Sequence, residues 1–150
     1  KFAKMGGTID LTCGESESKF HSVADAVKKA KKEGVPMEKV TMSSDGQGSW
    51  SNYDAEGKLV EIGVSDVDTI YRQIGYMGKE ENMDLEELLA LGTKNPAMAL
   101  ELYPKKGAVK EESDADILIM NEDLSLDTVI AMGVPMMRDG KILKKGTYEK

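Results

Sequence analysis

Asp45 is the residue whose type and position are best suited to chemistry. It directly follows residues 40–44, a short run that reads as a β-strand, and Gly46 and Gly48 come after it. In parallel α/β folds ligands gather at the carboxyl ends of the strands, so a carboxylate there is a candidate site residue. The glycines allow a ligand to approach the backbone closely, and Ser49 offers a hydroxyl. An Asp-Gly pair after a strand is also common as a plain turn, and that alternative stays open.

Weaker candidates flank the first predicted strand and the loop after the second. Asp10 and Glu15 could face the same mouth, although acidic loop residues are usually only solvated. His21 is the sole histidine, and no second His or Cys stands at metal-ligand spacing, which favours a surface or capping residue. Nothing near Cys13 indicates a lowered thiol pKa, so an ordinary half-buried thiol is expected. Trp50 either lines the mouth or covers the loop.

The composition of the 150 residues limits the classes of function. With 40% hydrophobic residues the chain can build the core of one domain, and its net charge of -7 argues against nucleic-acid binding. The single cysteine cannot form an internal disulfide, which fits a cytoplasmic protein. Neither a signal peptide nor an apolar run near the roughly 20 residues of a membrane span is visible. The first residue, Lys1, is expected to lie inside a longer gene product.

The first half of the chain has the pattern of a β–α–β unit. Residues 7–12 and 40–44 are short apolar runs, and between them apolar residues recur at helical spacing. Ser22 and Asp25 predict a capped helix start, and Gly34 predicts the helix end. Two strands joined by one helix are expected to pair in parallel.

The middle of the chain predicts a long connection and three helices. Residues 46–63 are polar and read as a functional or mobile loop, with a small hairpin as the alternative. Ser65 and Asp68 repeat the capping pattern before a second amphipathic helix. A further helix is predicted from Asp84, and a short one begins near Asn95.

Beyond residue 105 the hydrophobic pattern changes to a period of two. This predicts a small β-domain over residues 105–150, appended to an α/β body over residues 1–104. Asp139-Gly140 is a strong signal for a tight hairpin. The predicted strands cover residues 116–120, 127–132 and 141–144, with residues 136–138 as the first arm of the hairpin.

Several segments together carry a family resemblance. They are residues 6–12, 34–49, 54–64, 93–97, 114–118 and 134–149, which span essentially the whole chain. In these segments the sequence resembles the amidohydrolase superfamily and, within it, the isoaspartyl dipeptidase family. Asn-Pro-Ala at residues 95–97 and Asp-Ala-Asp at residues 114–116 are shared by many amidohydrolases. Ser-Ser-Asp-Gly-Gln-Gly-Ser at residues 43–49 is much narrower.

The resemblance implies an α/β fold of a defined kind, namely the C-terminal portion of a (β/α)8 barrel, with its last two strands and helices, plus part of a small β-sandwich domain. It also implies two zinc ions at the barrel mouth. Asp45 falls on the residue that contacts one zinc ion and takes a proton from the bridging water. Ser49 falls on a residue that holds the β-aspartyl dipeptide substrate, with Gly46 beside it. A carboxylate so placed can accept the proton of the attacking water and deliver it to the leaving amine.

The chain lacks most of the residues on which that chemistry depends. The family's His-x-His pair, its carboxylated lysine and two further histidines belong to the first six barrel strands, and His21 matches none of them. The resemblance therefore implies the C-terminal part of a cytoplasmic, homo-oligomeric zinc dipeptidase, inactive as this piece alone. The alternatives are a part of a dihydroorotase-like enzyme or a deacetylase, or a non-catalytic piece that associates with a partner chain.

Overall fold

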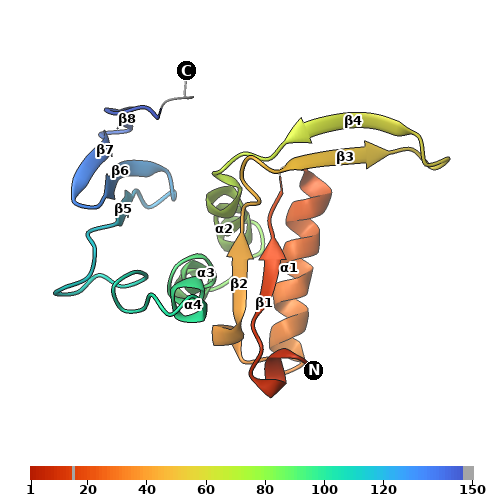
Figure 1. Cartoon of the computed structure of the whole chain (residues 1–150), viewed down its shortest axis with the longest axis horizontal. Helices are drawn as coiled ribbons and strands as arrows, with labels where there is room; N and C mark the ends of the chain where they lie inside the picture. The colour runs from red at the N-terminus through yellow and green to blue at the C-terminus, as the bar shows by residue number, and fades with distance from the viewer. Residues whose placement is uncertain (15, 147–150) are drawn as a thin grey trace.

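The computed structural model describes residues 1–14 and 16–146, so the candidate Glu15 lies outside the described residues. Figure 1 shows a β–α–β unit with helices packed beside it, a projecting hairpin and a separate small sheet. The body contains η1 (Ala3–Met5), β1 (Ile9–Thr12), α1 (Glu17–Lys32), η2 (Met37–Lys39), β2 (Val40–Ser43), β3 (Ser49–Tyr53), β4 (Leu59–Val64), α2 (Thr69–Lys79), α3 (Leu85–Gly92) and α4 (Lys94–Ala99). The small sheet contains β5 (Ile117–Met120), β6 (Leu126–Ala131), β7 (Val134–Arg138) and β8 (Lys141–Ile142).

The strands β1 and β2 pair in parallel, as the sequence predicts, with α1 joining them. Asp10 stands opposite Thr41, and Leu11 stands opposite Met42. Because side chains alternate along a strand, Leu11 and Met42 face the core while Asp10 and Thr41 face the other side. The pair thus has one apolar face, covered by helices, and one polar face.

The core joins α1, β2, α2 and α3. Met77, Leu88 and Leu91 are among its largest fully buried side chains. The strand pair alone could not bury this much apolar surface, so the helices that follow the hairpin complete the core. The buried cluster consists of Cys13, Val23, Ala24, Val27, Val40, Met42, Ile74, Met77, Leu88 and Leu91.

The predicted start of the first helix is wrong by more than one turn. The N-cap is Ser16, whose hydroxyl oxygen accepts a hydrogen bond from the Lys19 amide at 3.2 Å. Ser22 lies inside the helix, where its hydroxyl donates to the Lys19 carbonyl at 3.0 Å. Before Val23 the helix contains a single apolar residue, Phe20, and the serines at 16, 18 and 22 are all possible caps, so the periodic pattern alone does not fix the start.

The segment after β2 forms the hairpin that was the alternative interpretation of residues 46–63. Strands β3 and β4 are antiparallel, with Trp50 opposite Gly63. The Asp54 carboxylate stabilises the turn by accepting from the amides of Glu56, at 3.1 Å, and Lys58, at 2.7 Å. In Figure 1 the hairpin projects away from the body.

The starts of the two later helices differ in how they are capped. Asp84, from which the sequence predicts a helix, caps α3 by accepting from the Glu87 amide at 2.9 Å. Asp68 makes no side-chain cap bond to α2, and its carboxylate pairs with Arg72 at 2.9 Å. Ser65 uses its backbone in the hairpin base, so the prediction that it caps α2 is wrong.

Asn95 joins α4 to the beginning of β2. Its side-chain amide donates to the carbonyl oxygens of Met37 and Val40, both at 2.8 Å, and the residue is 4% exposed. The Asn-Pro-Ala segment therefore has a structural role in this chain, because it closes the end of the strand pair opposite the hairpin.

The small sheet has the order β5-β6-β7-β8 and contains the hairpin predicted at Asp139-Gly140. Asp116 attaches this sheet to the preceding segment, since its carboxylate accepts from the Met132 amide at 2.7 Å and from Lys106 at 2.5 Å. The Lys106 ammonium, followed by the Met132 amide, lowers the pKa of Asp116. No described helix is long and apolar enough to cross a membrane.

Candidate functional site

A cavity of about 330 Å³ opens where the chain leaves β1 and β2, and we call it the strand-end cavity. The Cys13 amide donates to the Ser43 carbonyl at 2.8 Å, which continues the strand ladder and brings the two following loops together. The described residues that line the cavity come from these loops, α1 and the hairpin: Thr12, Cys13, Gly14, Ser16, Lys19, Asp45, Trp50, Asn52 and Ser65.

Asp45 is held at the cavity by a tight backbone turn. Its φ of 48° lies in the left-handed region, and its carbonyl accepts from the Gly48 amide at 2.8 Å. A Cβ at Gly48 would lie 2.7 Å from Asp45 Oδ1, so only glycine leaves room for the carboxylate there. The turn therefore holds an exposed carboxylate at the end of a strand, beside the cavity.

The base of the hairpin brings Ser65 to the same cavity. The Gln47 amide donates to the Ser65 carbonyl at 2.8 Å, and the Ser65 amide donates to the Gly48 carbonyl at 2.9 Å. These two bonds tie the loop after β2 to the loop after β4. The sequence predicts Ser65 only as a helix cap and not as a cavity residue, because residues 46–64 separate it from Asp45 and no local pattern links the two.

Ser49 and Gly46 are not among the described residues that line the strand-end cavity. Ser49 is exposed at the start of β3, and the cavity is lined by Trp50 and Asn52 from that strand. The Gly46 amide already donates to the Ser44 hydroxyl at 3.0 Å. A substrate contact of either residue therefore stays a prediction.

Asp10 lies on the polar face of the strand pair and not at the cavity. Its carboxylate accepts from the Thr41 hydroxyl at 2.7 Å and from the Ser43 hydroxyl at 2.5 Å. These bonds join β1 to β2 across the face opposite the core. The carboxylate thus has a structural role in this chain.

Cys13 and His21 occupy different environments. Burial, followed by the Asp10 carboxylate, raises the pKa of Cys13 to about 11, so the thiol stays protonated at neutral pH and is a poor nucleophile. His21 is exposed, and its Nδ1 lies 2.6 Å from the Tyr76 hydroxyl. Within residues 1–14 and 16–146, no group of three or more His, Cys, Asp or Glu could hold a metal ion.

The Trp50 ring packs against Gly63. A Cβ at Gly63 would lie 2.1 Å from Trp50 Cζ2, so the ring packs directly on the glycine. We expect Gly63→Ala to displace the ring and to destabilise the hairpin by about 1 kcal/mol or more. Trp50 is the sole tryptophan, so its fluorescence emission should shift to the red.

The matched control for this substitution is Gly75→Ala. A Cβ at Gly75 in α2 meets nothing within 4 Å, so this variant should leave the emission unchanged. It should also stabilise the chain slightly, because alanine favours a helix. An unchanged emission spectrum in Gly63→Ala would contradict the packing of Trp50 on this glycine.

The chain has a carboxylate and a cavity at the carboxyl ends of a parallel strand pair. This arrangement is typical of α/β proteins that bind ligands at strand ends. The family model described as "Amidohydrolase family" matches residues 2–143. The chain belongs to the amidohydrolase family, and the resemblance seen in its sequence is confirmed.

Two solved β-aspartyl dipeptidase structures are similar to this chain over almost its whole length. The chain is 35% identical to a β-aspartyl dipeptidase from the thermophilic, keratin-degrading Fervidobacterium islandicum AW-1, solved with a β-Asp-Leu dipeptide. The match has a TM-score of 0.82 and covers 98% of this chain and 38% of that one. A second β-aspartyl dipeptidase structure from this organism is 31% identical, with a TM-score of 0.71, and covers 98% of this chain and 35% of that one. This chain therefore spans well under half of these relatives.

A more distant match shows the fold alone. An N-acetylglucosamine-6-phosphate deacetylase from Pasteurella multocida is 18% identical, with a TM-score of 0.59. The match covers 77% of this chain and 34% of that one. It supports the shared scaffold and carries no information on the substrate.

Proposed function

We propose that this chain is the C-terminal part of a longer, zinc-dependent isoaspartyl dipeptidase, which hydrolyses β-aspartyl dipeptides. The observation that carries the proposal is Asp45, held exposed at the end of β2 and at the edge of the strand-end cavity. The similarity to a β-aspartyl dipeptidase over 98% of the chain supports the choice of substrate. In this proposal β1 and β2 are the last two strands of a (β/α)8 barrel, residues 1–104 belong to the barrel and residues 105–150 to a small β-domain.

Asp45 acts in this proposal as the general base and then as the general acid. The oxygen of a water molecule attacks the side-chain amide carbon of the β-aspartyl group while Asp45 accepts a proton from that water. The carbon–nitrogen bond then breaks, and Asp45 returns the proton to the leaving amine. The products are aspartate and the second amino acid. Ser49 and the backbone at Gly46 are proposed to hold the dipeptide in the longer protein.

The described part of the chain cannot hold the two zinc ions by itself. Asp45 supplies one carboxylate, and a zinc site needs three or four ligands. We propose that the remaining ligands come from outside the described part of this chain and that the isolated chain is inactive. The coding sequence upstream of Lys1 should then contain a His-x-His pair.

We expect the isolated 150-residue chain to bind no zinc tightly. The experiment is metal analysis of the purified chain after incubation with zinc and exhaustive dialysis. A zinc content of one ion per chain that survives dialysis would contradict the proposed division of the ligands. Cys13→Ser and His21→Ala variants would then show which side chain is responsible.

The reaction is tested with the longer protein and one substrate from each related reaction. β-Asp-Leu, N-acetylglucosamine 6-phosphate and dihydroorotate are offered separately, and the products are identified by mass spectrometry. We expect hydrolysis of β-Asp-Leu alone. Release of acetate or opening of the dihydroorotate ring, without cleavage of the dipeptide, would replace this proposal with one of the related activities. Cytoplasmic location and a homo-oligomeric state are part of the same proposal.

A further inference from the structure

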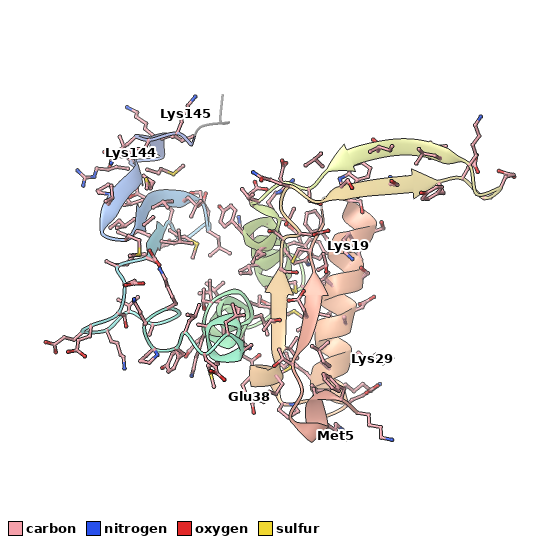
Figure 2. All side chains as sticks on the ribbon, viewed as in Figure 1. Met5, Lys19, Lys29, Glu38, Lys144 and Lys145 are labelled. Carbon is pink, nitrogen blue, oxygen red and sulfur yellow. The ribbon has the colours of Figure 1, made fainter. Side chains whose placement is uncertain are left out.

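The strand-end cavity contains one basic side chain among the described residues that line it, that of Lys19. Lys19 lies in the first turn of α1, close to the N-cap Ser16. Figure 2 shows Lys19 near the end of α1 that lies beside the hairpin, whereas Met5 and Glu38 lie at the opposite end of the strand pair. Asp45 and Lys19 thus contribute opposite charges to one cavity.

The stability of α1 does not explain why a lysine occupies position 19. A cation in the first turn is unfavourable to the helix dipole, whose positive end is there. Among the described residues Lys19 forms no ion pair within 4.0 Å, while Lys28 and Lys31 on the same helix pair with Glu81 and Glu87. Lys19 and the N-terminal end of α1 therefore both add positive charge at the wall of the cavity.

The stem of Lys19 is held against the loop after β1. A Cβ at Gly14 would lie 2.7 Å from Lys19 Cγ, so the side chain passes directly over this glycine. The positive charge of Lys19 also lowers the pKa of Cys13, against the larger, opposite effects of burial and of Asp10. This contact restricts the number of conformations available to the lysine and reduces the entropy that it loses on binding an anion.

The side chain of Ser65 is a second polar group in the wall of the same cavity. The residue is 9% exposed, and its backbone amide and carbonyl are both bonded within the hairpin base. Its hydroxyl has no hydrogen-bond partner among the described residues, although it belongs to the cavity wall. A hydroxyl with free hydrogen-bonding capacity in a cavity wall can donate to, or accept from, a bound ligand.

We infer that Lys19, assisted by the Ser65 hydroxyl, binds a carboxylate of the dipeptide and so helps to select substrates that carry two carboxylates. The inference rests on the proposed function, because the substrate is a β-aspartyl dipeptide. Such a dipeptide carries one carboxylate on its aspartyl group and another at its C-terminus. Each lies three bonds from the amide carbon that is attacked, so either can reach a cation beside Asp45.

The experiment uses Lys19→Met in the longer protein, with Lys19→Arg as the rescue and Lys29→Met as the control. Lys29 lies on the same helix away from the cavity, and its side chain is largely exposed. With β-Asp-Leu, Lys19→Met should raise KM about tenfold or more while kcat changes little, because a charged hydrogen bond to bound substrate is lost. Lys19→Arg should restore most of the affinity, and Lys29→Met should match the parent.

Two shortened substrates identify the carboxylate. β-Asp-leucinamide lacks the C-terminal carboxylate, and β-alanyl-leucine lacks the carboxylate of the aspartyl group. The parent and Lys19→Met should have equal KM values for the compound that lacks the carboxylate bound by Lys19. Two results would overturn the inference: an unchanged KM of Lys19→Met for β-Asp-Leu, or an equal rise in its KM for all three substrates. Neither result would contradict the proposed function. If the parent does not cleave β-Asp-Leu, the proposed function fails and the inference fails with it.

Discussion

Asp45→Asn in the longer protein is expected to lower kcat for β-Asp-Leu by at least about a hundredfold. Asparagine has the size of aspartate but cannot accept the proton of the attacking water at neutral pH. The fold should be retained, because Asp45 is exposed and its φ of 48° is one that asparagine adopts readily. The measurement is kcat together with the circular dichroism spectrum.

The control for this substitution is Asp139→Asn. Asp139 is also exposed and has a φ of 50°, but it lies in the turn between β7 and β8. Its substitution changes the same chemical group in the same backbone conformation, away from the strand-end cavity. If the Asp45→Asn protein is folded and has the same kcat as the Asp139→Asn protein, Asp45 has no catalytic role and is only a turn residue.

Asn95→Ala should lower the free energy of unfolding of the 150-residue chain by about 2 to 3 kcal/mol. The substitution removes both hydrogen bonds to the Met37 and Val40 carbonyls, in a position that is 4% exposed. It also leaves a small void between α4 and β2. Urea unfolding followed by circular dichroism measures the loss.

Asn121→Ala serves as the comparison for this measurement. Asn121 is exposed and bonds to the Ser125 hydroxyl at 2.9 Å, so its loss should change the stability by less than about 0.5 kcal/mol. Equal stabilities of the two variants would show that the Asn95 bonds contribute little to the attachment of α4.

The parallel strand pair and Asp45 could be predicted because their signals are local. Residues 7–12 and 40–44 are short apolar runs on either side of a helical pattern, and Asp45 directly follows the second run. The helix cap at Ser16 could not be placed in this way, because Ser16, Ser18 and Ser22 are all acceptable capping residues. Only the three-dimensional structure shows which of them accepts a bond from an N-terminal amide.

The rest of the strand-end cavity could not be predicted because its residues meet through nonlocal bonds. Lys19 and Ser65 reach the cavity from α1 and from the far end of the hairpin. The bonds of Gln47 and Gly48 with Ser65 close the hairpin base, and no periodic pattern in the sequence encodes them. The family resemblance implies a substrate contact of Ser49, which stays a prediction, while Trp50 and Asn52 are the residues of β3 that line the cavity.

The proposed function is tested most directly by comparing two isomers of one dipeptide in the longer protein. β-Asp-Leu is joined through the aspartyl side chain, and α-Asp-Leu through the backbone, so they differ only in the position of the scissile amide. We predict that kcat/KM for β-Asp-Leu exceeds that for α-Asp-Leu by at least about a hundredfold. Equal values for the two isomers, or no cleavage of β-Asp-Leu, would contradict the assignment of this chain to an isoaspartyl dipeptidase.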